Sequence, residues 1–364
     1  MTSDSASVRR LVVLSPNWLG DAVMALPAIA DTRRRFPNAR LSVAARRSVA
    51  DLFTMVRGVD QVVALEWNGK LQQHRALRQD IAAIKALEAD ATILLPNAFS
   101  AAWLVRRAGI GERWGYTADF RRPLLSRAVS RPRHSMHQTE YYQHLVRQLG
   151  MDSGPLEPAV LVPDDVVVGA RMLLNSRNWD KSRPLVAIAP GAAYGTAKRW
   201  LPEHYASLVS SLVHGGAQCV LVGSKGDVET TNWIQRLLPD NQRQEVLDLT
   251  GLTSLSLLVG VIAIARAFVS NDSGSMHLAA AVGTPVTAIF GPTREYETRP
   301  LPRAGARVQV LLHDVWCRPC MLRECPIDHR CMKGLSPDRV LITVRESMAD
   351  SLPGPQSRTR PTAS

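Results

Sequence analysis

Leu11-Val12-Val13-Leu14, followed at once by Ser15-Pro16-Asn17-Trp18-Leu19-Gly20-Asp21, is the stretch that indicates the fold of this chain. The four apolar residues predict a buried strand, and a helical pattern begins just behind the turn that contains Gly20. A buried strand that turns directly into a helix is how α/β domains commonly begin. An export signal that starts at the arginine pair 9–10 is the weaker interpretation, because polar residues interrupt the apolar region.

The same alternation of short apolar runs and helical patterns continues along the chain and predicts a parallel sheet in each half. In the first half the predicted strands are 11–14, 41–44, 61–64 and 91–95, and the predicted helices are 22–36, kinked at Pro27, 49–56, 71–88 and 137–149. In the second half the predicted strands are 185–189, 219–222, 246–249, 267–270 and 286–290. The stretch 154–165 contains three prolines and is typical of a linker. We therefore predict an α/β protein with two doubly wound domains, 1–160 and 161–350, and a disordered tail, 351–364.

The chain carries an excess of positive charge that is concentrated in its first half. Its 364 residues are too many for one ordinary core, and 46% hydrophobic with 21% charged residues is a globular composition. The net charge is +12, and residues 1–150 hold 22 of the 44 basic but only 12 of the 32 acidic residues, a net of +10. An anionic partner is therefore expected at the first half. The longest nearly apolar stretch, 255–265, is shorter than the roughly 18 residues that span a bilayer.

Asp21 is the first candidate for a functional residue, because ligands of doubly wound sheets bind beyond the carboxyl ends of the strands. It could cap the helix that begins there. It could also act as a carboxylate base in an interdomain cleft and accept a proton from a hydroxyl group. The two roles are compatible, so both stay open.

The loop after the predicted strand 185–189 has the composition of a phosphate-binding loop. It reads Pro190-Gly191-Ala192-Ala193-Tyr194-Gly195-Thr196-Ala197-Lys198-Arg199-Trp200. Its glycines let backbone amides approach a phosphate group closely, and Lys198 supplies a cation. It lacks the Walker pattern, so phosphate binding would not imply nucleotide hydrolysis of that type. A solvated basic loop is the alternative.

The strand 267–270 is followed by Asn271-Asp272-Ser273-Gly274-Ser275-Met276-His277 and a helix of small residues. The N-terminus of such a helix presents free amides and a partial positive charge to an anion. His277 lies near the first turn and could donate to a phosphate oxygen. A capping Asp272 or Ser273 with His277 in the core is the alternative. The turn Phe290-Gly291-Pro292-Thr293 follows the next strand and would close the same pocket.

Two further patterns do not point to a site. The glycines at 109, 111 and 115 resemble a dinucleotide-binding loop, but their spacing is wrong and they follow a predicted helix rather than a strand. The arginine pairs of the first half are not accompanied by a nucleic-acid-binding module, so we expect no nucleic-acid partner.

Four of the five cysteines lie within fifteen residues, at Cys317, Cys320, Cys325 and Cys331. They could hold zinc or an iron–sulfur centre, although the spacing differs from that of a common zinc ribbon. Reduced thiols or a local disulfide are the favoured alternatives, and we predict no metal in the site. Such crowding does not resemble a secreted disulfide framework, so a cytoplasmic protein is expected.

Taken together, these motifs resemble glycosyltransferase family 9, the heptosyltransferases of lipopolysaccharide core synthesis. The motifs that carry the resemblance are Asn17-Trp18-Leu19-Gly20-Asp21, the loop 190–200, the helix start 272–280 and Phe290-Gly291-Pro292-Thr293. The segment that ends in Cys331-Met332-Lys333 is also similar to one common in the family, and the resemblance extends from about residue 11 to residue 348. Trp18 and the residues at 193–196 and 273–276 are closer to the type II enzymes of the family.

The resemblance implies a GT-B fold of two Rossmann-like domains, in which basic residues of 1–150 hold the acceptor and the second domain holds the nucleotide sugar. It implies inverting transfer of L-glycero-D-manno-heptose from ADP-heptose to the heptosyl-Kdo2-lipid A inner core, with no cofactor besides this co-substrate. Asp21 matches the family's catalytic base. The residues expected to bind the donor are Gly195, Thr196, Lys198, Asp272, Ser273, Gly274 and His277.

The expected location is the cytoplasm, peripherally at the inner membrane, where the basic first domain would meet a phosphorylated Kdo-lipid A acceptor. One alternative is a family 9 enzyme with a different core acceptor or sugar nucleotide. A remoter alternative is a non-catalytic protein that binds polyanions through its arginines.

Overall fold

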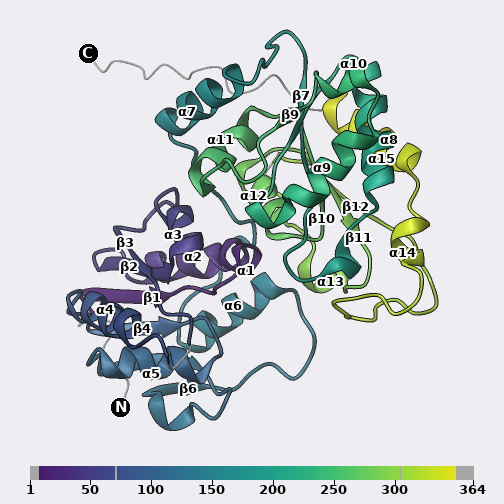
Figure 1. Cartoon of the computed structure of the whole chain (residues 1–364). Coiled ribbons are helices and arrows are strands. Elements are labelled where there is room, and N and C mark those ends of the chain that lie inside the picture. The colour runs from purple at the N-terminus through teal and green to yellow at the C-terminus, as the bar shows by residue number, and fades with distance from the viewer. Residues whose placement is uncertain (1–7, 70–71, 304, 350–364) are drawn as a thin grey trace. The chain divides into compact units, whose positions relative to one another are not determined.

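The computed structural model describes residues 8–69, 72–303 and 305–349, and the tail predicted at 351–364 lies outside these residues. The chain divides into two compact units. The first unit comprises Met1–Pro163 with Arg294–Ala304, and the second comprises Asp164–Thr293 with Gly305–Ser364 (Figure 1).

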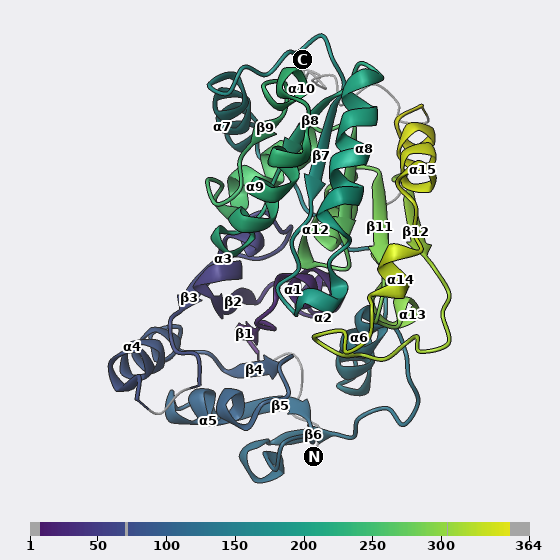
Figure 2. The ribbon, with the colours of Figure 1, turned by 45° about the vertical axis from the view of Figure 1, so that its right-hand side comes forward.

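The first unit contains a six-stranded parallel sheet in the order β3-β2-β1-β4-β5-β6. Its strands are β1 (Arg10–Leu14), β2 (Arg40–Arg46), β3 (Gln61–Leu65), β4 (Ala91–Leu94), β5 (Glu112–Tyr116) and β6 (Arg127–Val129). Its helices are α1 (Leu19–Met24), α2 (Leu26–Arg35), α3 (Arg47–Phe53), α4 (His74–Lys85), α5 (Phe99–Arg107), the short η2 (Arg122–Leu124), α6 (Gln138–Gln148) and α13 (Glu295–Thr298). Helices α4 and α5 cover one face of the sheet, and α1, α2 and α3 cover the other (Figures 1 and 2).

The second unit repeats this design with a six-stranded parallel sheet in the order β12-β11-β10-β7-β8-β9. Its strands are β7 (Leu185–Ala189), β8 (Gln218–Leu221), β9 (Leu247–Asp248), β10 (Ala267–Asn271), β11 (Val286–Phe290) and β12 (Val308–Leu312). Its helices are α7 (Asp164–Asn175), η3 (Thr196–Lys198), α8 (Pro202–His214), η4 (Lys225–Asp227), α9 (Val228–Leu237), α10 (Asp240–Arg243), α11 (Leu255–Ile264), α12 (Gly274–Val282), α14 (Arg330–Lys333) and α15 (Pro337–Ala349). The prediction of an α/β protein with two Rossmann-like parallel sheets is confirmed.

Each sheet has one point at which the strand order reverses, between β1 and β4 in the first unit and between β7 and β10 in the second. In open α/β sheets, ligands bind beyond the carboxyl ends of the strands at this switch point. The loops that follow β1, β7 and β10 are the ones that carry the predicted site residues. The topology therefore puts the predicted residues of each unit at the place where such a sheet binds ligands.

The structure corrects the sequence prediction at several elements. The helix predicted at 22–36 is two helices, because the chain breaks at Ala25 and Pro27 takes part in the first turn of α2, where its missing N–H costs no hydrogen bond. Strands β5, β6 and β12 were not predicted. Strands β6 and β12 are edge strands whose residues are mostly half-buried, so they lack the continuous apolar run of a central strand.

The segment Arg294–Ala304 groups with the first unit, whereas the sequence predicts it within the second domain, 161–350. The His137 ring lies 2.9 Å from the carbonyl oxygen of Arg299, and the Arg303 guanidinium donates to the carbonyl oxygen of Val160 at 3.3 Å. These bonds attach the segment to the start of α6 and to the end of the first unit. Among the described residues, none of the helices is both long and apolar enough to cross a membrane.

Candidate active site

Asp21 lies in the first turn of α1, directly beyond the carboxyl end of β1. The helix begins at Leu19 and its N-cap residue is Trp18, so the prediction that Asp21 occupies the N-cap position is wrong. An acidic residue in the first turn is still favoured by the helix dipole. The interpretation of Asp21 as a base is not affected by this shift of the helix start.

Tyr142 of α6 contacts Asp21, and the sequence analysis did not single it out. Its hydroxyl donates a hydrogen bond to Oδ1 of Asp21 at 3.3 Å, and its side chain is almost completely buried. Burial raises the pKa of Tyr142 well above its ordinary value, and the Asp21 carboxylate raises it further. The phenol therefore stays protonated and can donate to Asp21 throughout the neutral pH range.

A hollow at the carboxyl ends of β1 to β4 lies next to the turn that leads to Asp21. Its lining includes Asn17 of that turn, Arg46 at the end of β2, Trp67 after β3 and Ser100 of α5. From the sequence, Arg46 is expected to belong to a solvated arginine pair. Its place at the last residue of a strand was the signal that could have identified it.

The loop 190–200 is fixed to the neighbouring strand by Asn271, the last residue of β10. The Asn271 amide donates to the carbonyl oxygen of Pro190 at 2.6 Å, and its oxygen accepts from the backbone N–H of Trp200 at 3.0 Å. The hydroxyl of Tyr205 donates to the same oxygen at 2.9 Å. Because both ends of the loop bond to one buried side chain, the loop is held in a defined shape beyond β7.

Lys198 and Asp272, which the sequence analysis predicted separately, form an ion pair. The ammonium group of Lys198 lies 2.6 Å from Oδ2 of Asp272, and the side chains are only 14% and 5% exposed. Thr293 Oγ1 donates to the same carboxylate oxygen at 2.6 Å. The ammonium also lies 4.8 Å from the ring centroid of Tyr194. The loops that follow β7, β10 and β11 thus meet around one cation.

The helix α12 begins at Gly274, with Ser273 as its N-cap residue and no side-chain capping bond. The Ser273 hydroxyl instead lies 2.8 Å from the hydroxyls of both Ser270 and Ser275. The free amides of the first turn carry the positive end of the helix dipole, so this end of α12 suits an anion. His277 lies in the same helix but is 4% exposed, which places its ring within the core of the unit rather than on an open surface.

Thr196 and Gly195 lie where the loop approaches the cysteine-rich segment 317–331. Thr196 is exposed, at the start of the 3-10 turn that contains Lys198. A Cβ atom on Gly195 would lie only 2.3 Å from the carbonyl oxygen of Arg323, and that oxygen accepts from the N–H of Ala197 at 2.9 Å. Only a glycine allows the two backbones to approach this closely.

The cysteine-rich segment also contacts the turn after β11. Arg318 Nε donates to the carbonyl oxygen of Gly291 at 2.7 Å, and the N–H of Met321 donates to that of Pro292 at 2.9 Å. The segment therefore packs against two of the loops that surround Lys198, the loop 190–200 and the turn after β11.

The cysteines themselves carry free thiols, so the local disulfide that the sequence left open is not present. Burial raises the pKa of the Cys331 thiol, which favours its protonated form. Within the ranges that the structure describes, three or more His, Cys, Asp or Glu side chains do not gather in a geometry that could hold a metal ion.

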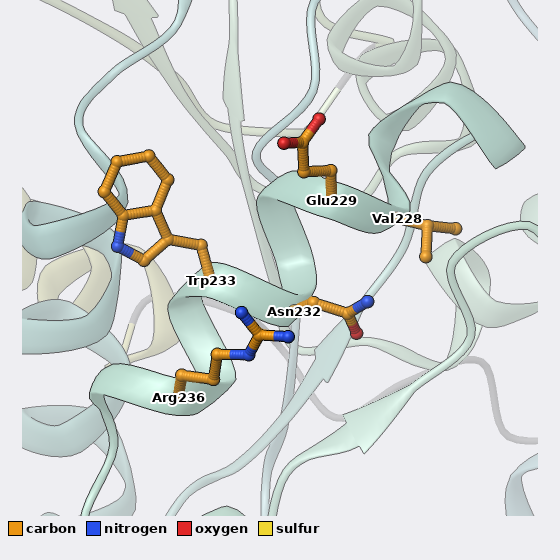
Figure 3. Close-up of a pocket in the computed structure, with 5 residues that line it drawn as sticks. All are labelled: Val228, Glu229, Asn232, Trp233 and Arg236. Atoms are coloured by element: carbon orange, nitrogen blue, oxygen red, sulfur yellow. The ribbon is translucent and has the colours of Figure 1, made fainter.

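A second surface hollow contains none of these residues in its lining. It is lined by Val228, Glu229, Asn232, Trp233 and Arg236, which all belong to α9 (Figure 3). Since one helix supplies every lining residue, the hollow lacks the converging groups from several strand ends that a substrate site needs.

The chain is similar to known proteins over most of its length. The model of the family described as glycosyltransferase family 9 (heptosyltransferase) matches residues 76–330. Lipopolysaccharide heptosyltransferase 2 of Salmonella typhimurium is 29% identical over 312 residues, which cover 83% of this chain and 88% of the relative. The solved structure of ADP-heptose lps heptosyltransferase II of E. coli has a TM-score of 0.80 and 27% identity, covering 93% of this chain and 98% of that one. A family 9 glycosyl transferase from Veillonella parvula shares the fold, with a TM-score of 0.81, 18% identity and coverage of 94% and 98%.

Proposed function

Since this chain belongs to glycosyltransferase family 9 (heptosyltransferase), we propose that it transfers L-glycero-D-manno-heptose from ADP-heptose to the heptosyl-Kdo2-lipid A inner core during lipopolysaccharide biosynthesis. The chain is a glycosyltransferase of the GT-B fold, and the proposal concerns its donor and its acceptor. The observation that carries it is the meeting of Lys198, Asp272 and the start of α12 at the switch point of the second sheet. A cation beside free helix amides fits the diphosphate of a nucleotide sugar.

In the proposed mechanism Asp21 is the general base. It accepts the proton of the acceptor hydroxyl as that oxygen attacks the anomeric carbon of the heptose. The bond between this carbon and the ADP oxygen breaks on the opposite face, so the configuration inverts. Tyr142 orients the carboxylate by donating a hydrogen bond to Oδ1.

The departing ADP gains negative charge on its diphosphate, and the second unit supplies donors to stabilise it. Lys198 and the amides that follow Ser273 are the proposed partners, with Gly195 and Thr196 shaping the loop that carries Lys198. Each preorganised donor of this kind commonly contributes about 3–4 kcal/mol to barrier reduction. Asp272 holds Lys198 in position when the diphosphate is absent. His277 supports the start of α12 from the core.

The proposed location is the cytoplasmic face of the inner membrane, where the protein is peripheral. The net charge of +10 on residues 1–150 favours an acceptor that carries phosphate and Kdo carboxylate groups. In this proposal the hollow that contains Arg46 and Trp67 belongs to the acceptor side of the reaction.

Replacing Asp21 by Asn tests the role of the base. Asp21→Asn should reduce transfer from ADP-heptose to a heptosyl-Kdo2-lipid A acceptor by at least about a hundredfold, because the side chain can no longer accept a proton. Calorimetry should show nearly unchanged ADP binding. Asp51→Asn, at an exposed position of α3, is the matched control and should retain full activity.

The assignment of Asp21 is wrong if Asp21→Asn turns over at the wild-type rate. Calorimetry with ADP, UDP and GDP then tests the donor separately. Tighter binding of UDP or GDP than of ADP would contradict ADP-heptose and support a family 9 enzyme with another sugar nucleotide.

A further inference from the structure

Two of the phenylalanines of this chain are exposed, and they belong to two segments that contact each other. The sequence contains six phenylalanines, and all six belong to the described residues. Four of them, Phe36, Phe53, Phe268 and Phe290, are buried in the two units. Phe99 is 44% exposed and Phe120 is 96% exposed. Large exposed apolar side chains that gather at one place indicate an interaction surface, whereas isolated ones are ordinary.

Asp119 joins the two segments that carry these phenylalanines. Its carboxylate accepts a hydrogen bond from the backbone N–H of Phe99 at 2.6 Å, and Phe120 is the next residue along the chain. Phe99 is the first residue of α5, and Phe120 belongs to the segment between β5 and β6, at the lower edge of the first unit in Figure 2. Two segments that are twenty residues apart in the sequence are thus joined directly beside two exposed phenylalanines.

The backbone at Phe120 is held in a conformation that a bulky residue rarely adopts. Asp119 and Phe120 have φ angles of 47° and 55°, in the left-handed region. The next residue, Arg121, is completely buried and donates to the carbonyl oxygens of Tyr116, at 2.9 Å, and Pro96. Arg121 therefore anchors the loop to the ends of β4 and β5, and the exposure of Phe120 is imposed by the fold.

The surroundings of this pair are strongly basic. Residues 96–135 contain eight arginines but only two acidic residues, a net charge of +6 within forty residues. Arg122, Arg131 and Arg133 are exposed. Arg131 lies close enough to Tyr141 to affect the pKa of that phenol, and Tyr141 packs on Tyr116 at the end of β5. The basic charge thus lies at the same end of the sheet as the two exposed rings.

We propose that this surface, made of Phe99, Phe120, Arg122, Arg131 and Arg133, docks on an anionic lipid bilayer. The arginines bind the headgroup phosphates, and the two rings enter the interfacial layer of the membrane. The inference deepens the proposed peripheral location and rests on it for the choice of partner. It uses neither Asp21 nor the loops around Lys198, so it can fail or hold independently of the transfer reaction.

Vesicle co-sedimentation of the full chain tests the proposal without any turnover. The wild type should bind vesicles of phosphatidylcholine mixed with phosphatidylglycerol and bind pure phosphatidylcholine poorly, with affinity that falls as salt increases. Phe120→Gly should weaken binding to the anionic vesicles by about tenfold, because it removes the ring. Glycine adopts the same backbone conformation without strain, so the variant should fold and melt at or above the wild-type temperature.

Matched controls distinguish binding through this surface from non-specific hydrophobic or electrostatic binding to the vesicles. Ile342→Ala removes a side chain that is 58% exposed on α15 of the second unit, and it should not change vesicle binding. Arg131→Gln with Arg133→Gln should reduce binding to anionic vesicles and flatten its salt dependence. Arg177→Gln, at an exposed position of the second unit, should do neither.

A second measurement reports whether the side chain at position 120 enters the membrane. In Phe120→Trp, brominated lipids should quench more fluorescence than in the wild type, whose eight tryptophans give the background. Vesicle binding of Phe120→Gly at the wild-type level would overturn the proposal. So would a change in self-association, measured by sedimentation velocity, with vesicle binding unaltered, since the surface would then join two copies of the chain.

Discussion

Asp21 and Tyr142 form the contact on which the proposed chemistry of the first unit depends. The carboxylate comes from the first turn of α1 and the phenol from α6, and the two segments are 121 residues apart in the sequence. Burial keeps the phenol protonated because it raises the pKa of Tyr142. A buried donor of fixed orientation favours the ionised form of the carboxylate and holds it in one rotamer.

Replacing Tyr142 by Phe should therefore change how activity depends on pH. Without the phenol, Asp21 takes up a proton more readily, so the acid limb of the kcat/KM profile should move to higher pH by about half to one unit. Activity on the alkaline side should fall by less than about tenfold, because the carboxylate itself remains. The measurement is kcat/KM for transfer across the pH range, with circular dichroism to verify folding.

Tyr141→Phe is the matched control on the same helix. Its hydroxyl accepts from the Asn97 amide at 2.8 Å, and that bond does not involve Asp21. The control should keep the acid limb of the wild type. Equal shifts in the two variants would mean that α6 acts through general packing and that Tyr142 does not position the base.

At the scale of elements, the conformation of the loop 190–200 depends on a segment that is far away in the sequence. Asn271 forms hydrogen bonds with the two ends of the loop. The cysteine-rich segment 317–331 contacts the middle of the loop at Gly195. The guanidinium of Arg323 also lies 5.0 Å from the ring of Tyr194, on which Lys198 packs. The position of Lys198 is therefore set jointly by β10 and by this segment.

Gly195→Ala should weaken nucleotide binding. The added methyl group would meet the backbone oxygen of Arg323, which cannot rotate away, so the loop and Lys198 must shift. We expect ADP affinity in calorimetry to fall by at least about tenfold, which is the loss expected when one charge-assisted bond of about 1.5–3 kcal/mol is misplaced. Gly111→Ala is the control, since a Cβ there meets no atom within 4 Å. Unchanged ADP affinity in Gly195→Ala would show that this close approach does not position Lys198.

At the scale of the whole molecule, one architecture is used twice. Both units have the same strand order, and each carries its predicted residues at its own switch point. The buried ion pair and the free helix end belong to the second unit, whereas Asp21, Tyr142 and most of the excess positive charge belong to the first. Because of this distribution, we propose that the second unit binds the donor and the first unit binds the acceptor.

Hydrogen exchange of the full chain with and without ADP tests which unit binds the nucleotide. At about a hundred times its Kd, a ligand stabilises the structure it binds by about 2.7 kcal/mol. ADP should therefore slow exchange in peptides that cover 190–200 and 272–293 and leave α1 and α6 nearly unchanged. Protection confined to α1 and α6 would reverse the proposed roles of the two units.

Much of the fold could be read from local patterns. A central strand of a parallel sheet is buried on both faces, so β7 is a continuous apolar run and β1 and β11 are apolar at all but one residue. The rule that sites follow such strands pointed to Asp21, Lys198 and Asp272. Strands β5 and β6 escaped prediction because polar and small residues interrupt them, and neighbouring strands supply the pairing that stabilises them. Local sequence patterns predict a strand poorly where only one face of that strand is buried.

The two parallel sheets and the strand-end motifs could be predicted from the sequence alone, because they follow from hydrophobic periodicity and from the residue types that follow a buried strand. Three contacts could be seen only in the folded protein: Tyr142 donates to Asp21, Lys198 pairs with Asp272, and the cysteine-rich segment packs against the loop at Gly195. Each of these contacts joins residues far apart along the chain. Their distances are set by how strands and helices pack, and no local pattern in the sequence records that packing.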